Sequence, residues 1–308
     1  MIASDLGLVV LAPRAIGGPA LELDFVLGQY GRSGESATAF AALSGTSFSR
    51  AGAGTAYTVA GALAPFASGL ARTTDRGLLL ESARTNKVSC CNADPTDLTN
   101  IARSGDAAAT LSVVDDTAAL VAAGLSAVCE GGRAFRLDNT AGSGNAIARI
   151  VGQVGNTNLH TMSLWVRMAA SGGQAGLLNG SQSGFVSSGP AFGALASYAR
   201  VASSMTADTN SREMGLRIPA GAVAYFILMQ IEEGASGSSP IVTAGTATTR
   251  GADVASVIAP GNVSTWSATY GVANATASGS VTPGATFDLV TGRPWLGVGN
   301  ELKRLVMA

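Results

Sequence analysis

The chain has 308 residues, of which 47% are hydrophobic and 13% are charged, and its formal net charge is −1. This apolar fraction excludes wholesale disorder, and the even balance of 19 basic and 20 acidic side chains excludes the basic surface typical of nucleic-acid binding. The length predicts about two domains, or one large β domain, and so little charge predicts that part of the surface is covered in an assembly.

Several whole-chain signals are absent. The first residues, Met1–Asp5, contain no basic side chain, so a secretory signal peptide is not expected. The longest purely apolar run, Val223–Met229, is far shorter than the roughly 18–20 residues that span a bilayer. Cys90, Cys91 and Cys129 match no metal-binding spacing, and either all are free or one of the first two pairs with Cys129. We treat them as small buried hydrophobic residues and expect neither a metal site nor a cofactor.

Residues 1–95 are rich in glycine and alanine and show weak periodicity, which predicts an extended N-terminal attachment arm. Ser36–Leu43 within it fits either a short helix or a loop. The segment Gly77–Asn86 begins with an apolar strand of three leucines, after which Glu81 and Arg84 are close enough to pair. Backbone carbonyls are an alternative target for Arg84, and Asn86 suits a turn or a cap. We interpret this segment as a structural clasp between the arm and the next domain.

Residues 96–258 carry the clearest alternation of apolar and polar side chains, which predicts a jelly-roll-like β-sandwich. Asp115–Leu125 fits a short helix or an alanine-rich loop. The stretch Tyr225–Ile231 is apolar on both faces and is therefore predicted to be a central strand. The other predicted strands are bounded by Gly, Asn or Ser turns: Ala134–Asp138, Ala146–Val151, Thr161–Met168 and Glu213–Ile218.

Residues 259–308 follow Pro260-Gly261 and contain short strand patterns with aromatic residues. A piece of about 50 residues buries too little apolar surface to fold alone. We therefore expect a short C-terminal β extension that packs on neighbouring parts of the chain or on other copies of it.

Five stretches of the chain follow a shared pattern: Leu21–Val26, Thr46–Tyr57, Arg76–Asn86, Gln230–Gly234 and Thr248–Val254. In order and spacing the first three resemble the N-terminal module of bacteriophage virion appendage proteins, the tail fibres, head fibres and spikes, and the last two resemble the segment that ends the lectin-like sandwich after that module. The usage of alanine and arginine is similar to that of phages and gene transfer agents from high-GC hosts. The chain departs from the pattern at Pro240–Thr243, where relatives have Tyr-Ile-Pro-Thr, and it has only a short piece where many relatives carry a second lectin-like domain.

The resemblance implies a carbohydrate-binding-module-like sandwich in residues 96–258 and a place on the virion, reached after assembly in the bacterial cytoplasm. It implies a homo-oligomer, most commonly a trimer, and contacts to other virion proteins through the N-terminal arm or the C-terminal extension. It assigns a structural role to the motif residues, which are Gly77, Leu78, Leu80, Glu81, Arg84, Thr85, Asn86, Arg250 and Asp253.

Catalytic patterns are weak in this sequence. His160 is the single histidine, no nucleophile elbow accompanies it, and we expect an ordinary turn or surface residue. Glycoside hydrolysis needs two carboxylates flanking one bond, roughly 5–10 Å apart. The candidate pairs are Asp115/Asp116, Glu232/Glu233 and Asp75/Glu81, and neighbours on one strand point to opposite faces. The sequence therefore predicts that the chain is not an enzyme, with capsule depolymerase kept as a lesser alternative.

Sugar binding without catalysis needs exposed aromatic faces beside polar groups. Trp165 is on the polar face of its predicted strand together with Arg167, and the alternative is that a second layer or the arm covers it. The candidate carbohydrate contacts are Trp165, Arg167, Tyr198, Arg200, Trp266 and Tyr270, the last two of which also suit a subunit interface. The sequence thus predicts a fibre or spike subunit that binds host polysaccharide. A spike-base, decoration or adaptor protein that binds no glycan is the main alternative.

Overall fold

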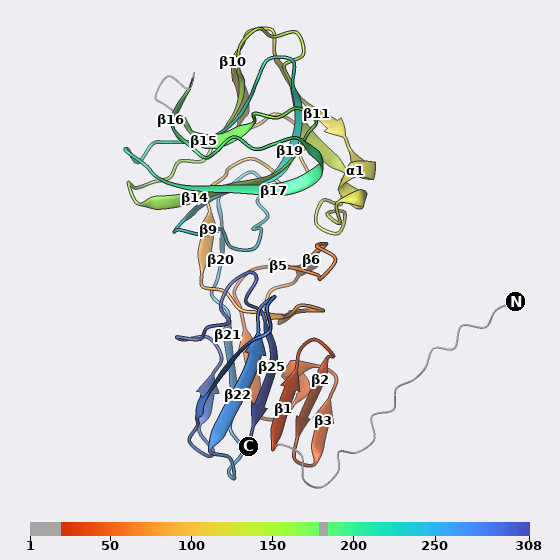
Figure 1. Cartoon of the computed structure of the whole chain (residues 1–308), viewed down its shortest axis with the longest axis vertical. Helices are drawn as coiled ribbons and strands as arrows, with labels where there is room; N and C mark the ends of the chain where they lie inside the picture. The colour runs from red at the N-terminus through yellow and green to blue at the C-terminus, as the bar shows by residue number, and fades with distance from the viewer. Residues whose placement is uncertain (1–19, 179–183) are drawn as a thin grey trace, which may run out of the picture.

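The computed structural model of the protein describes residues 20–178 and 184–308. The first 19 residues of the predicted N-terminal arm therefore lie outside the described residues. The chain forms two β lobes joined by a narrower waist (Figure 1). Apart from α1 (Thr117–Ala122) and a 3-10 turn (Phe40–Ala42), every regular element in the described part of the chain is a strand. The predicted all-β class is therefore confirmed.

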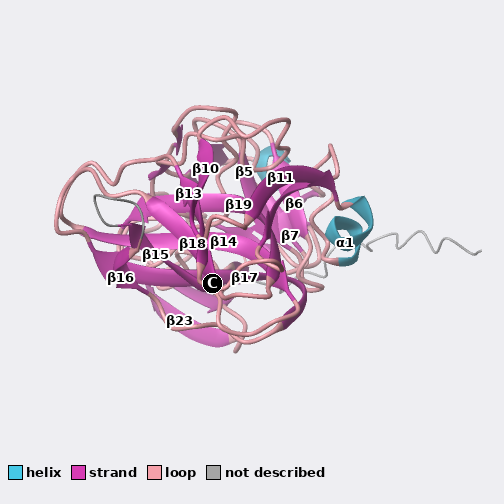
Figure 2. Ribbon diagram, turned by 90° about the horizontal axis from the view of Figure 1, so that it is seen from above, coloured by secondary structure: helices cyan, strands magenta, loops and turns pink. Residues whose placement is uncertain are grey.

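The upper lobe is a sandwich of two five-stranded antiparallel sheets, made from one continuous stretch of chain. Their strand orders are β10-β13-β18-β15-β16 and β11-β12-β19-β14-β17, with α1 at one side of the stack (Figure 2). The bounds are β10 Ile101–Gly105, β11 Thr110–Asp115, β12 Arg133–Asp138, β13 Ala146–Ile150, β14 Leu159–Met168, β15 Gln174–Leu178, β16 Phe185–Ser188, β17 Leu195–Thr206, β18 Met214–Ile218 and β19 Val223–Glu233.

Alternation along these strands fills the space between the two sheets. Met162, Leu164 and Val166 of β14 are fully buried in this core, because every second side chain of a strand points to the same face. β19 is the middle strand of its sheet, and both of its faces are covered, as the sequence predicted. Its second face packs under α1 and a hairpin from the waist.

The lower lobe is built from both ends of the chain. Its larger sheet has the order β23-β22-β25-β1-β2-β3, with β8 joined to β25 and β7 to β8, and its smaller sheet has the order β24-β21-β4. The bounds are β1 Leu21–Asp24, β2 Gln29–Arg32, β3 Glu35–Ala37, β4 Thr46–Ser49, β7 Arg72–Thr74, β8 Gly77–Leu79, β21 Val254–Ile258, β22 Thr265–Tyr270, β23 Ala275–Ser280, β24 Thr286–Asp288 and β25 Leu302–Met307.

The waist consists of two short pairs of strands and the loops between them. β5 (Gly54–Tyr57) and β6 (Leu63–Phe66) form a hairpin, and β9 (Arg84–Asn86) pairs with β20 (Thr248–Arg250). The chain therefore enters the upper lobe along β9 and leaves it along the neighbouring β20.

The predicted division at residues 95 and 258 is corrected by this arrangement. Residues 21–86 are not an extended arm, because β1 pairs with β25 and β4 pairs with β21. The C-terminal residues do lean on neighbouring chain, and that neighbour is the N-terminal region of the same molecule. These strands are three to six residues long and their partners are distant in sequence, so no local period reveals them.

We predict that Leu305→Ala destabilises the protein by about 2–5 kcal/mol, because this side chain is fully buried between the two ends of the chain. Lys303→Ala on the same strand is the control and costs about 0.5 kcal/mol or less, since its ammonium group donates to the exposed side chain of Asn274. Urea unfolding of both variants measures the difference. Equal, small losses would mean that β25 is a dispensable extension.

Candidate functional site

The waist contains a cluster of buried charges. Arg50, Arg72 and Arg250 are at most 4% exposed, and Glu81 and Asp253 are at most 5% exposed. They come from segments far apart in sequence, since Asp253 follows β20 and Arg72 lies on β7. Buried charges are costly unless they are paired, so this cluster holds those segments in one arrangement.

Each carboxylate of the cluster is shared between two guanidinium groups. Glu81 Oε2 lies 2.5 Å from Arg72 Nη1 and 3.2 Å from Arg250 Nη1. Asp253 pairs with Arg72 Nη2 and, at 3.4 Å, with Arg50 Nη1. Through these shared contacts each of the three guanidinium groups has at least one carboxylate partner.

The upper lobe joins the cluster through Ser239, which lies between β19 and β20. Its backbone N–H donates to Glu81 Oε1 at 2.8 Å, and its hydroxyl donates to Glu81 Oε2 at 2.6 Å. Burial by itself disfavours the ionised carboxylate, but Arg250 and Arg72 outweigh it and hold the pKa of Glu81 below its ordinary value. Glu81 is therefore ionised at neutral pH.

Asn86 stabilises a bulge in the central strand of the upper lobe. Between Ser163 and Trp165 the β14–β19 register shifts, and Leu228 takes a positive φ of 52°, which is unusual for a bulky residue. The Asn86 amide donates 3.0 Å hydrogen bonds to the carbonyls of Met229 and Ile241, and its Oδ1 accepts the N–H groups of Val88 and Ile231. Asn86 thus makes the hydrogen bond of an Asx turn with Val88, as the sequence suggested, and it is also a buried brace of β19.

The predicted pairing of Glu81 with Arg84 does not form. Glu81 turns into the buried cluster, whereas Arg84 donates to the backbone carbonyl of Glu233, the alternative target considered from sequence. Thr85 pairs its hydroxyl with that of Thr249 at 2.8 Å. Gly77 has no room for a side chain, since a Cβ there would lie 2.5 Å from the Leu302 carbonyl oxygen.

The candidate sugar contacts of the upper lobe lie together, but they are covered. Trp165 is only 8% exposed, and its ring centre lies 6.3 Å from that of Tyr57 on the waist hairpin. Arg200 donates to the Tyr57 hydroxyl at 3.2 Å and to Ser163 Oγ at 2.9 Å. The expectation that Trp165 offers an open face is therefore corrected, because the hairpin packs on that face of the sheet.

The neighbouring candidates Arg167 and Tyr198 are engaged with Asp116. Arg167 Nη2 lies 2.8 Å from Asp116 Oδ1, and the Tyr198 hydroxyl donates to Asp116 Oδ2 at 2.6 Å. The Arg167 guanidinium also lies 3.9 Å from the ring centre of Tyr225. These contacts attach the start of α1 to the sheet and leave Tyr198 only 5% exposed.

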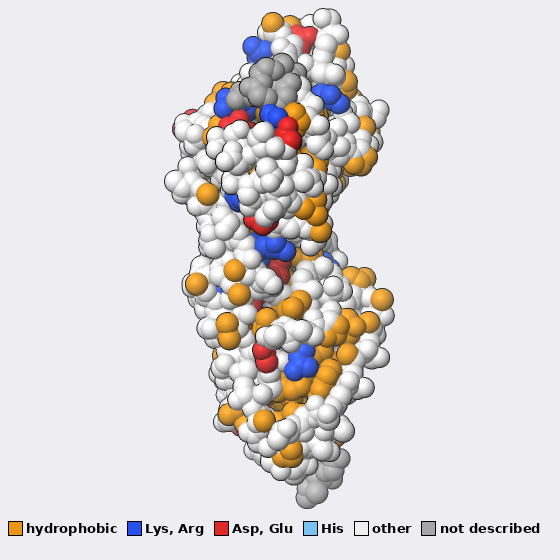
Figure 3. All heavy atoms as spheres, turned by 90° about the vertical axis from the view of Figure 1, so that its left-hand side faces the viewer, with side chains coloured by type: hydrophobic (Ala, Val, Ile, Leu, Met, Phe, Trp, Pro, Cys, Tyr) orange, Lys and Arg blue, Asp and Glu red, His pale blue; other side chains and the backbone are white. Residues whose placement is uncertain are grey.

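The candidates of the lower lobe keep an accessible side. Trp266 and Tyr270 are partly exposed and both contact the buried Trp295, with ring centres 5.7 and 6.1 Å apart. Arg293 lies over this aromatic group, 4.0 Å from the ring centre of Phe287 and 5.3 Å from that of Trp266. Hydrophobic side chains gather on the surface of the lower lobe beside a basic and an acidic side chain (Figure 3).

A hollow of about 410 Å³ adjoins Trp266. Hydroxyl side chains, a valine, a glycine and the last residue complete its lining: Thr265, Ser267, Ser278, Val306, Gly279 and Ala308. Because neighbouring residues of a strand point to opposite faces, the hydroxyl groups face this hollow, whereas the Trp266 ring lies on the other face of the sheet against Phe287 and Trp295. A partly exposed aromatic ring beside a guanidinium group, as Trp266 is beside Arg293, suits the recognition of a sugar ring. Sequence reasoning found Trp266 but not Arg293 or the small residues of β23, because no local pattern marks them.

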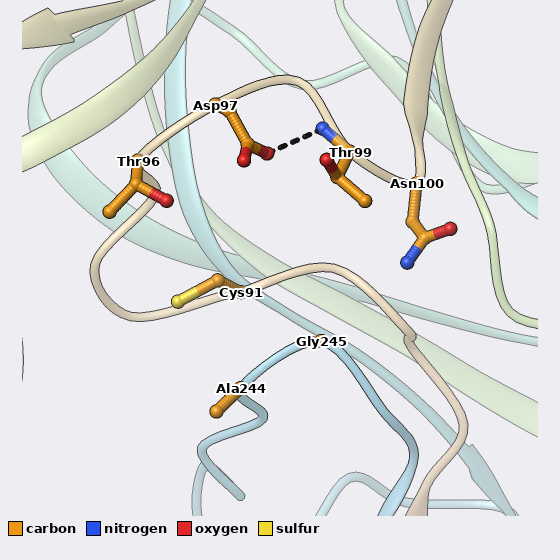
Figure 4. Close-up of a pocket in the computed structure, with 7 residues that line it drawn as sticks. All are labelled: Cys91, Thr96, Asp97, Thr99, Asn100, Ala244 and Gly245. Atoms are coloured by element: carbon orange, nitrogen blue, oxygen red, sulfur yellow. Dashed lines mark hydrogen bonds between the residues drawn. The ribbon is translucent and has the colours of Figure 1, made fainter.

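A second hollow, of about 290 Å³, contains Cys91 and lacks aromatic side chains (Figure 4). Its Asp97 accepts the Thr99 N–H at 2.7 Å. All three cysteines are free, which decides between the alternatives left open by the sequence, and burial raises the pKa of Cys90 and of Cys129 to about 12. Within residues 20–178 and 184–308, no cluster of His, Cys, Asp or Glu is arranged to hold a metal ion.

The candidate acidic pairs are separated by their contacts. Glu232 is fully buried and bonded to Ser238, whereas Glu233 accepts the side-chain amides of Asn156 and Asn158. His160 is also buried, within β14, with Nδ1 2.8 Å from the Asn158 carbonyl, so the expected turn or surface position is corrected. No helix in the described part of the chain is long and apolar enough to span a bilayer.

The other two acidic pairs show the same separation. Asp75 accepts the Val59 N–H, whereas Glu81 lies in the buried cluster. Asp115 accepts the Thr117 N–H, whereas Asp116 binds Arg167 and Tyr198.

Comparison with known proteins yields remote structural matches. No family model and no curated protein matches the chain. Solved structures that match include a protein from Bacteroides thetaiotaomicron proposed to bind sugar (8% identity, TM-score 0.31, covering 48% of this chain and 100% of that one). Two others come from Paenibacillus barcinonensis Xyn10C: the CBM22-1 xylan-binding domain (9%, 0.31, 50% and 94%) and the CBM22-1-CBM22-2 tandem (10%, 0.34, 74% and 90%). Likenesses this remote carry no argument about function.

We predict that Glu81→Gln lowers the free energy of unfolding at pH 7 by about 3–5 kcal/mol, because it leaves buried guanidinium groups without a counter-charge. The loss is full above the ordinary carboxyl pKa of 4.5 and shrinks as the pH falls through the lowered pKa of folded Glu81, where the native carboxyl also becomes neutral. Urea unfolding across pH 3–7 measures it.

The matched control is Glu22→Gln. Glu22 pairs with Arg304, whose side chain is 49% exposed, so this change costs about 1 kcal/mol or less. A pH-independent loss in Glu81→Gln would contradict the assigned charge state.

Proposed function

We propose that this protein is a non-catalytic structural subunit of a phage-type virion appendage, and that its lower lobe binds a bacterial surface polysaccharide. The observation that carries the proposal is that the two separated motif segments meet in one buried unit. Glu81, Arg250 and Asp253 contact one another there, and β9 pairs with β20. The pattern that resembles appendage proteins is thus a set of side chains that determine this fold.

The polysaccharide contact is assigned to Trp266, with Tyr270 and Arg293 beside it. Trp165 and Tyr198 are buried, whereas Trp266 is partly exposed and has the Arg293 guanidinium beside its ring. A single shallow contact of this kind binds weakly. Many copies on one particle raise the overall affinity through avidity, without a deep cleft.

A second candidate function is that of a spike base, decoration or adaptor protein that binds no glycan. The burial of Trp165 favours it, since this alternative requires that the waist hairpin and not a ligand cover that side chain. Capsule depolymerase activity has less support, because the candidate carboxylates bind separate structural partners.

We expect the protein to be part of assembled particles. An antibody raised against the purified chain would detect it in particles banded on a density gradient from a lysate of the source strain, and immunogold labelling would place it on a fibre or spike. Free protein stays in the upper fractions and is the internal control. Particles that infect normally but lack the chain would contradict the virion role.

We predict that Trp266→Ala weakens binding to the recognised polysaccharide about tenfold, because the sugar loses its stacking surface. An array of purified bacterial capsular polysaccharides and O-chains measures it, with Arg293→Ala as a second variant of the same surface.

The matched control is Phe185→Ala in the upper lobe, which is also partly exposed and lies 5.0 Å from a guanidinium carbon. Equal losses in the two aromatic variants would contradict the assigned surface. Failure of the folded wild-type protein to bind any polysaccharide, while it is present on particles, would establish the adaptor role.

A further inference from the structure

The edge strand β23 lacks the usual protection of a sheet edge. It reads Ala-Thr-Ala-Ser-Gly-Ser, with no charged residue and no proline, and five of its six residues are exposed. It pairs with β22 in an unbroken register over six positions, and no other strand of the described chain pairs with its outer side. Proteins normally block a regular edge of this kind with a charge, a proline, a bulge or a covering element.

The opposite edge of the same sheet is protected. β3 is only three residues long and carries Glu35, whose carboxylate accepts the N–H of Ser44. The two edges of one sheet therefore differ in protection. This difference indicates that the unprotected edge at β23 forms a contact with another chain.

The backbone of β23 has a defined set of unpaired groups. Thr265 exchanges both of its hydrogen bonds with Ala308 on the β25 side, and Val281 donates to Ser264 at 2.9 Å on the β23 side. Hydrogen bonds alternate along an antiparallel ladder. The N–H and C=O groups of Thr276, Ser278 and Ser280 therefore point away from β22.

We propose that two copies of this chain pair antiparallel through β23, about a two-fold axis at Ser278. This register places Ser278 opposite the same residue of the second copy, and Thr276 opposite Ser280. All the outward backbone groups of the strand then find partners. The strand has no charge, so no like charges meet at the axis, and a two-fold contact closes without leaving a new edge.

Side chains beside the edge fit the same partner. Gly279 leaves space for the Trp266 ring, since a Cβ there would lie 3.0 Å from Trp266 Nε1. Partly exposed Ala277 and Val281 extend the lower-lobe core to this side. A second copy would cover this apolar margin. The pairing does not depend on glycan binding.

Disulfide trapping tests the register. In a Cys91→Ser background, which removes the partly exposed native thiol, Ser278→Cys is expected to form a covalent dimer on mild oxidation. Hydrogen-bonded antiparallel pairs have Cα atoms about 5.5 Å apart, within the range that a disulfide bridges. Thr276→Cys is the matched control, because its two copies lie about 14 Å apart along the strand and cannot bridge.

Mass in solution tests the stoichiometry. Light scattering is expected to give twice the chain mass of 30.6 kDa for the wild type and a monomer for folded Ser278→Lys, in which two ammonium groups meet at the axis. A wild-type monomer, a trimer of the kind that the resemblance implies, or equal cross-linking of the two cysteine variants would overturn the proposal. None of these readouts involves polysaccharide, so they are independent of the proposed binding function.

Discussion

Three buried guanidinium groups and two buried carboxylates at the waist set the shape of this molecule. Each charge is tolerable only while its partners are in place. Those partners belong to the loop after β4, to β7, to the segment after β8, to the end of β20 and to the connection between β20 and β21. Ser239 extends the network to the upper lobe. Apolar packing fills the two lobes, but this network specifies how their chain segments meet.

The same constraint explains why the shared motif is split. Glu81 and Asp253 are separated by 172 positions, yet the backbone N–H of Glu81 donates to the Asp253 carboxylate at 2.7 Å. Neither half of the motif can satisfy its charges alone. A motif of this kind indicates the fold and says little about the ligand, which has to be sought where side chains remain accessible, as around Trp266.

Sequence reasoning succeeded where a pattern is local. The alternation in Thr161–Met168 and the two-faced apolar run in Tyr225–Ile231 predicted strands that the structure contains, one of them central. It failed for residues 21–86, where β1, β4 and β9 pair with strands far along the chain. It left open whether Trp165 is exposed or covered by a second layer or the arm, because alternation shows which side of a sheet a residue occupies and not what packs on that side. The structure supports the covered alternative, since the hairpin that packs on Trp165 lies within the predicted arm.

The paired strands β9 and β20 have a consequence for how such a chain diversifies. The upper lobe begins and ends at adjacent positions, Asn86 opposite Thr248, and the lower lobe and charge cluster are completed by residues outside it. Another domain whose termini lie side by side fits between these two strands if it also replaces the contacts of Ser239 to Glu81 and of Trp165 to Tyr57. The upper lobe is therefore an inserted domain on a constant lower lobe. Recombination between β9 and β20 can exchange the inserted domain, and with it the surface that it carries, while the lower lobe stays the same.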